Sequence, residues 1–130
     1  MPYVTSFFQL PCGARCSRVN TSGTFSREDG VTLIHDWEPG GPLHGLPALV
    51  QTRELASVSA EARGFFAGRG SFLEEDPWVA VVVTNPVIRV TTNFILRIQK
   101  SKTVRLFSGE PEAIQWLDER IRKERAAKAS

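Results

Sequence analysis

The chain is poor in the residues that build covalent or metal-centred frameworks. Among its 130 residues are two cysteines, Cys12 and Cys16, and two histidines, His35 and His44. A tetrahedral zinc site needs four ligands, and these residues come from unrelated parts of the chain. A disulfide between the two cysteines would close a very small loop around a predicted turn, and a reducing cytosol disfavours it. We therefore expect free thiols, no metal and no cofactor.

Long apolar runs and a strong excess of one charge are also lacking. No apolar run approaches the roughly 20 residues that a membrane-spanning helix needs. The N-terminal residues show no basic segment followed by a long apolar core, so no signal peptide is visible. The formal net charge of +2 is too small to indicate nucleic acid as a partner. These features predict a cytoplasmic protein that does not bind nucleic acid.

Patterns of catalytic residues are missing as well. The sequence has no glycine-rich phosphate loop, no nucleophile elbow and no catalytic pair of carboxylates. His35 and Asp36 are neighbours on a predicted helix and so point in different directions, which is poor geometry for a dyad. His44 lies in a loop rich in proline and glycine, where a solvated histidine is the simplest interpretation. We therefore expect that the protein is not an enzyme.

The most informative stretch runs from Trp78 to Phe107. It opens with a continuous apolar, β-branched run at 78–83, which is typical of a strand buried on both faces. Pro86 is well placed to begin a helix that continues to Lys100. Residues 103–107 then indicate a second strand. Strand, helix and strand with short joints predict a right-handed crossover and two neighbouring parallel strands.

The helix 86–100 is expected to turn one broad apolar face toward the core. At helical periodicity this face consists of Val87, Val90, Phe94, Ile95 and Ile98, with Ile88 at its edge. The remaining elements fit around the central stretch. Further strands are expected at 3–10, 15–21 and 46–51, the first two as a hairpin. Further helices are expected at 26–37, 60–67 and 108–121.

These elements predict one α/β domain over residues 1–130. From Arg122 onward the residues are polar, so we expect the segment 122–130 to fray.

The order of the elements and four short motifs resemble the SpoIIAA-like proteins of the STAS/SEC14 superfamily. The motifs are SGTFSRED at 22–29, SVSAEAR at 57–63, NPVIR at 85–89 and LFSGEPEAIQWL at 106–117. They consist of caps, turns and core stripes, which are specific for architecture more than for activity. The resemblance implies a mixed β-sheet of four to five strands, with helices packed mainly on one face and an N-terminal β-hairpin.

The resemblance also implies two functions. Anti-sigma factor antagonists of this superfamily bind a kinase-like partner and are switched by phosphorylation of a serine in an Asp-Ser-Ser-Gly-type motif. The matching stretch here contains Ser57 and Ser59 but lacks both the acidic residue and the glycine. A phosphate on either serine could sit at a helix N-terminus, although a serine there is usually only a cap.

SEC14-type relatives instead enclose a lipid between sheet and helices. Aromatic residues that could line such a cavity, or equally fill a core, are Phe65, Phe66, Phe72, Phe94 and Trp116. In a chain of this size a filled core is the better interpretation. Binding of a lipid or other hydrophobic ligand therefore remains the alternative function.

The surface of the helix 86–100 carries the remaining functional signal. Leu96 lies within a polar and basic rim on the face opposite the predicted core stripe, which is typical of a contact site. A single exposed leucine also needs no explanation. The sequence predicts a non-catalytic regulatory or scaffold module that binds a protein, with a homodimer as one candidate. The residues expected to contact the partner are Asn85, Arg89, Asn93, Leu96 and Lys100.

Overall fold

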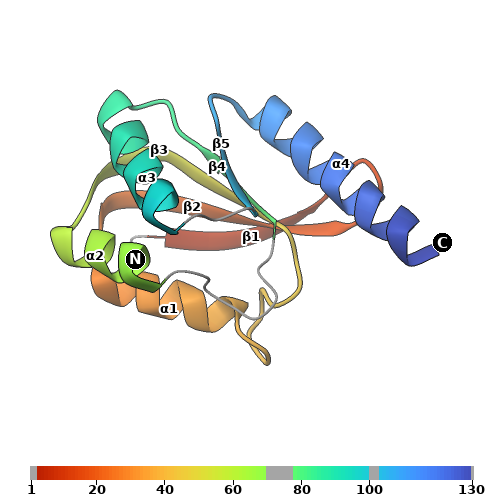
Figure 1. Cartoon of the computed structure of the whole chain (residues 1–130), viewed down its shortest axis with the longest axis horizontal. Helices are drawn as coiled ribbons and strands as arrows, with labels where there is room; N and C mark the ends of the chain where they lie inside the picture. The colour runs from red at the N-terminus through yellow and green to blue at the C-terminus, as the bar shows by residue number, and fades with distance from the viewer. Residues whose placement is uncertain (1–2, 70–77, 100–102, 130) are drawn as a thin grey trace.

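The computed structural model describes residues 3–69, 78–99 and 103–129, with the side chains of 67–69 and 94–99 excepted (Figure 1). Its strands form one mixed sheet in the order β1-β2-β3-β4-β5. They are β1 (Tyr3–Gln9), β2 (Arg15–Phe25), β3 (Ala48–Val58), β4 (Val79–Val82) and β5 (Val104–Phe107). β1 and β2 pair antiparallel, which confirms the predicted hairpin. All other neighbours are parallel, including the predicted pair of β4 and β5.

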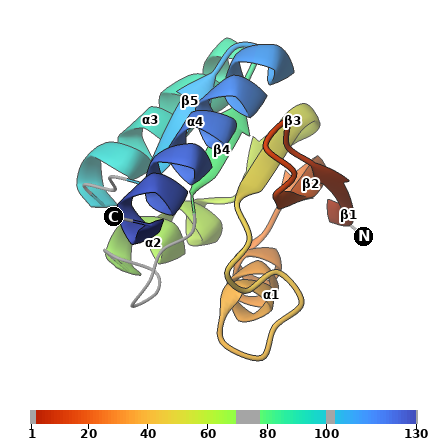
Figure 2. The same ribbon diagram turned by 90° about the vertical axis from the view of Figure 1, so that its right-hand side faces the viewer.

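Helices cover both faces of the sheet, unequally. They are α1 (Arg27–Trp37), α2 (Ala60–Arg69), α3 (Pro86–Gln99) and α4 (Glu110–Ala129). Buried residues of α1, α2 and α3 share one apolar core with the sheet, and those of α4 form a second core on the opposite face (Figure 2). The sheet therefore carries helices mainly on one face, as predicted. Within the described residues, no helix combines the length and hydropathy that crossing a bilayer requires.

β4 explains why the sequence at 79–82 is apolar without alternation. Val79 and Val81 face the core beneath α1–α3, whereas Ala80 and Val82 face α4. All four residues are buried, because successive side chains of a strand point to opposite faces and both faces are covered here. The predicted doubly buried strand is confirmed.

α4 extends further than expected and holds the β1–β2 turn. The segment 122–129, which we expected to fray, is helical. Asp118 accepts a hydrogen bond from the Cys12 backbone N–H at 2.8 Å and one from Arg122 Nε at 2.8 Å. Arg125 Nη1 donates to the Cys12 carbonyl at 2.9 Å. These bonds give the polar end of the helix a tertiary anchor that its composition alone does not reveal.

Candidate functional site

α3 begins directly behind β4, so its first turn lies at the carboxyl edge of the sheet. The Asn85 carboxamide oxygen accepts a hydrogen bond from the Val87 backbone N–H at 2.8 Å and thereby caps the helix. Pro86 is the first helical residue, as predicted. The cap stabilises the first turn of α3, which presents the residues described next.

The first turns of α3 expose apolar side chains that the sequence had placed in the core. Val87 and Val90 are each 70% exposed, whereas Ile88, predicted at the edge of the core face, is 2% exposed. Thr92 joins Ile88 on the inner side, where its hydroxyl donates to the Ile88 carbonyl at 2.7 Å. The predicted core face was therefore wrong for these two valines. Apolar residues occur on both sides of the first turns of this helix, so hydrophobic periodicity did not identify the buried side there. The side chains of Phe94, Ile95 and Ile98, the other members of the predicted face, lie outside the described residues.

Arg89 connects three elements. Its Nη2 donates to the Val83 carbonyl at 2.8 Å and to the Ser108 hydroxyl at 3.0 Å. The guanidinium thus joins the end of β4 and the start of α3 to the residues that precede α4. Arg89 is half-buried, and its hydrogen bonds give it a structural role within the fold.

The other residues predicted to bind a partner are placed unevenly. Asn85 and Asn93 are exposed on α3 and its cap, close in sequence to the two valines. The side chain of Leu96 and the whole of Lys100 lie outside the described residues. The structure therefore brings Asn85, Arg89 and Asn93 to one helix, while the contribution of Leu96 and Lys100 remains a prediction.

Ser57 and Ser59 lie at the joint between β3 and α2. Ser59 accepts a hydrogen bond from the Ala62 backbone N–H at 3.0 Å and so caps α2. Ser57 is the penultimate residue of β3, and its exposed hydroxyl lies 3.0 Å from that of Thr24. The two serines therefore differ in role, since one hydroxyl stabilises the helix start and the other faces solvent.

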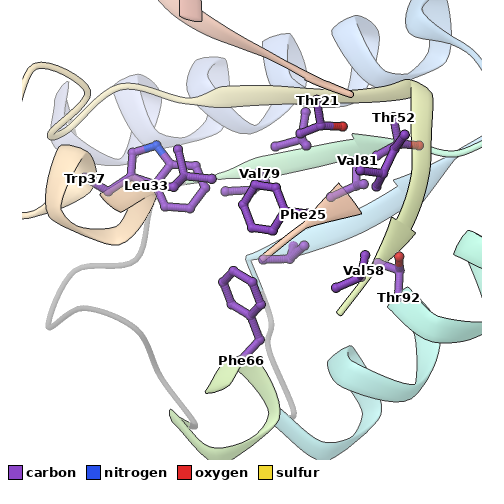
Figure 3. A pocket seen from close by; sticks show the side chains of 13 residues that line it. Thr21, Phe25, Leu33, Trp37, Thr52, Val58, Phe66, Val79, Val81 and Thr92 are labelled. Atoms are coloured by element: carbon purple, nitrogen blue, oxygen red, sulfur yellow. The ribbon is translucent and has the colours of Figure 1, made fainter. Parts of the chain in front are cut away.

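An apolar cavity of about 150 Å³ lies between the sheet and the helices α1, α2 and α3 (Figure 3). Phe25 and Phe66 stack across it with their ring centroids 6.1 Å apart. The hydroxyls of Thr21 and Thr52 on its sheet side are satisfied by the Gln51 and Val82 carbonyls. The described lining is Thr21, Phe25, Leu33, Trp37, Val50, Thr52, Leu55, Val58, Phe66, Val79, Val81, Thr92 and Val104.

The cavity uses few of the aromatic residues that the sequence offered for it. Phe66 lines it, and Phe65 packs edge-on against Phe66 at 5.4 Å. Trp116, a residue of α4, lies on the opposite face of the sheet against Trp78, so of the two roles considered for it, it fills a core and does not line the cavity. Phe72 and the side chain of Phe94 lie outside the described residues.

The titratable groups of the described residues do not converge on a reaction centre. Burial raises the pKa of the Cys16 thiol to about 12, which keeps it protonated and unreactive. Burial, with help from nearby Asp36, raises the pKa of Tyr3 to about 12. His35 lies 3.1 Å from Glu38 on an exposed helix end, and His44 bonds the Trp37 carbonyl at 3.0 Å. No group of three or more potential metal ligands occurs in the part of the chain that is described.

The antiparallel hairpin, the parallel β2–β5 order and the unequal helix layers define a SpoIIAA-like α/β domain. The fold is similar to the crystal structure of an uncharacterized protein from the DUF3478 family with a SpoIIAA-like fold, from Shewanella loihica PV-4. The TM-score is 0.57 at 16% sequence identity, and the match covers 88% of this chain and 94% of that chain. The model of a domain of unknown function, DUF7793, matches residues 44–121, and the chain belongs to this family. A search of curated proteins found no match.

Proposed function

We propose that this domain is a non-catalytic, STAS-like regulatory or scaffold module that acts in the cytoplasm by binding a protein partner through α3. The observation that carries the proposal is the pair of exposed valines on one side of that helix, Val87 and Val90. Two cysteines without a disulfide, Cys12 and Cys16, are compatible with a reducing compartment.

The exposed side of α3 has the composition and the rigidity of a small contact site. Residues three positions apart lie on the same side of a helix, so Val87 and Val90 form one apolar patch. Asn85 and Asn93 supply hydrogen-bonding groups at either end of it. Burying each valine against a partner would contribute about 1–2 kcal/mol. The cap at Asn85 and the tie through Arg89 hold this turn in place before binding, which lowers the entropy cost of association.

The substitution pair Val87→Asp and Val90→Asp is expected to reduce partner capture at least tenfold. Two carboxylates placed in an apolar contact must be desolvated on binding, and this opposes association. The measurement is quantitative mass spectrometry of proteins co-purified with the tagged domain from its own host. Both valines are exposed, so the thermal melt of the variant should match that of the native protein.

The matched control is Val4→Asp, because Val4 is a similarly exposed valine on the distant strand β1. It should leave capture through α3 unchanged. If the double variant retains the captured proteins, α3 is not the contact. If Val4→Asp alone removes them, the contact lies on β1.

We place the phosphorylation that the resemblance suggests on Ser57 in preference to Ser59. Ser57 is exposed, whereas the Ser59 hydroxyl is used by the α2 cap. A phosphate on Ser57 would add charge next to Thr24 at the joint of β3 and α2.

The cavity favours a second candidate function, binding of a small hydrophobic ligand. Its described lining is almost wholly apolar, and the hydroxyls of Thr21, Thr52 and Thr92 are already hydrogen-bonded, so an apolar guest would take no partner from them. The buried Nε1–H of Trp37 in the same lining has no hydrogen-bond partner among the described residues, and an apolar guest would not change that. A cavity of about 150 Å³ is large enough for a benzene-sized group. This size fits a ring or a short alkyl end better than a whole acyl chain.

A ring-sized apolar ligand is therefore expected to raise the melting temperature. Ligand at several times its Kd should add about 1 kcal/mol, or roughly 4 °C, for a domain of this size. Thermal melts with and without benzene would measure the shift, and native mass spectrometry would show any ligand retained from the host. Val50→Phe places a larger side chain in the cavity and should abolish the shift in melting temperature. An equal shift in this variant would mean that benzene binds elsewhere, and no shift in the native protein would exclude the cavity as a ligand site.

A further inference from the structure

The outer edge of β1 is a strand edge without the usual protection. β1 ends the sheet, and within the described residues its only strand partner is β2 (Figure 2). Its seven residues include no charge and no proline, and Val4 and Phe7 are 62% and 41% exposed. At the other end of the sheet, β5 has four residues and carries the exposed Arg105. Natural sheets protect their edges with short strands, charges, prolines or bulges, and β5 follows this rule whereas β1 does not.

The backbone groups that β1 offers at this edge follow from its hydrogen bonds. The Leu10 N–H donates to the Ala14 carbonyl at 2.8 Å, so these two residues are a hydrogen-bonded pair of the antiparallel ladder. Such pairs alternate along the ladder, and the register therefore directs the even-numbered residues of β1 toward β2. The N–H and C=O groups of the odd-numbered residues point outward. These are Tyr3, Thr5, Phe7 and Gln9.

The outward groups of β1 are complementary to those of a second copy. With Ser6 on a two-fold axis, Tyr3 lies opposite Gln9 of the second copy, and Thr5 lies opposite Phe7 of the second copy. Each of the four outward residues then exchanges an N–H and a C=O with its counterpart, and none is left over. A shift to an axis on Thr5 or on Phe7 leaves one outward residue of each strand without a counterpart. The seven-residue strand therefore has one register that satisfies its whole edge.

The side chains agree with this register. Val4 lies opposite Phe8 of the second copy, on the face of the sheet that α4 covers, so the exposed valine would gain an aromatic neighbour. Ser6 faces its own counterpart across the axis, and two serines meet there without steric or electrostatic conflict. An uncharged strand is what a self-pairing edge requires, because any charge near the axis would meet its like.

We propose that the chain forms a two-fold homodimer through antiparallel pairing of its β1 strands. Two five-stranded sheets would then continue into one sheet of ten strands. The only strand edges left open in the described part of the dimer would be those of β5, which are short and carry Arg105. The pairing therefore closes after two copies and does not extend into a filament. The dimer leaves α3 free, so it does not depend on the function proposed above.

Sedimentation velocity over a concentration series up to several hundred micromolar tests the dimer. Native protein should show a concentration-dependent monomer–dimer equilibrium. Thr5→Pro removes an outward N–H but none that bonds β2, and it should weaken the dimer at least tenfold. Ser6→Lys places two ammonium groups across the axis and should do the same. Melts by circular dichroism should confirm that both variants are folded.

The most specific test of the two-fold axis mixes two variants that are each expected to be monomeric. Ser6→Glu should also fail to self-associate, yet an equimolar mixture of Ser6→Lys and Ser6→Glu should form a heterodimer, because opposite charges then meet at the axis. Gln115→Lys, an equal change of charge on the exposed side of α4, should leave the native dimer intact. A native protein that stays monomeric overturns the proposal. A dimer that survives both Thr5→Pro and Ser6→Lys also overturns it. If Val87→Asp breaks the dimer, the interface lies on α3 and not on β1.

Discussion

Gly41→Ala is expected to destabilise the domain by about 3 kcal/mol or more. A Cβ atom at Gly41 would overlap the backbone carbonyls of His35 and Asp36, closer than real Cβ contacts come. A flexible side chain could move aside, but these atoms belong to the last turn of α1. Relief therefore requires the loop and the helix end to separate.

The loop that contains Gly41 has little room to separate from the helix. The Gly41 N–H donates to the Glu38 carbonyl at 2.8 Å, and the Leu43 N–H donates to the Asp36 carbonyl at 2.9 Å. The second bond directs Leu43 into the core, where it is almost fully buried. Displacing the loop would thus disturb a core leucine and the neighbouring Trp37, which lines the cavity.

Gly64→Ala is the matched control for this substitution. Gly64 lies in α2, and a Cβ there would meet nothing within 4 Å. Alanine should stabilise that helix by up to about 1 kcal/mol, so the same chemical change should have opposite signs at the two positions. Urea denaturation measures both, provided that the m-values agree. Equal midpoints for Gly41→Ala and the native protein would show that the loop can move away from α1.

The strand and cap signals of the sequence were sufficient for the architecture. The unbroken apolar run at 78–83 predicted a strand buried on both faces, because a strand in a sheet with helices on both faces is apolar on both sides. The helix start at Ser26, the first residue of the predicted helix 26–37, was found because the chemistry of a helix cap is local. Ser26 and Asp29 form a capping box, in which the Asp29 N–H donates to the Ser26 hydroxyl at 3.2 Å. Sequence features whose chemistry is confined to one turn of the chain therefore predicted the structure correctly.

The orientation of α3 could not be read from the sequence in the same way. Its first half carries valines on one side and Ile88 with two threonines on the other, and a hydropathy period ranks the valines first. In the fold, Ile88 and Thr92 instead point inward. A threonine is accommodated there because it borders the cavity and its hydroxyl donates to the Ile88 carbonyl of the same helix. The choice depends on which neighbours α2 and β3 present, and that information is tertiary.

The positions of Trp116 and Arg89 depend on the same kind of information. Handedness rules govern a helix that joins two parallel strands, and they place α1, α2 and α3 on one face. α4 follows the last strand, so no such rule assigns its face, and Trp116 went to the opposite core. Arg89 was predicted on a free surface because its acceptors, Val83 and Ser108, come from two other segments.

Leu117→Ala is expected to cost about 2–5 kcal/mol of folding free energy, comparable in size to the effect at Gly41. Leu117 is fully buried in the core between α4 and the sheet, where it packs with Leu49, Ala80 and Val82. Alanine is at least as good a helix former as leucine, so the loss comes from packing alone and not from helix propensity. The shortened side chain leaves a cavity that the surrounding strands cannot close.

Lys123→Ala separates this packing effect from any general weakening of α4. Lys123 is exposed on the same helix, and its replacement should change the unfolding free energy by no more than about 0.5 kcal/mol. Urea denaturation of the two variants should therefore differ by at least about 1.5 kcal/mol. Because α3 lies on the other face of the sheet, Leu117→Ala should still capture partners through Val87 and Val90 under conditions where it remains folded. A variant that is folded but no longer captures them would show that the two faces are coupled through the strands that contribute to both cores, such as β3 and β4.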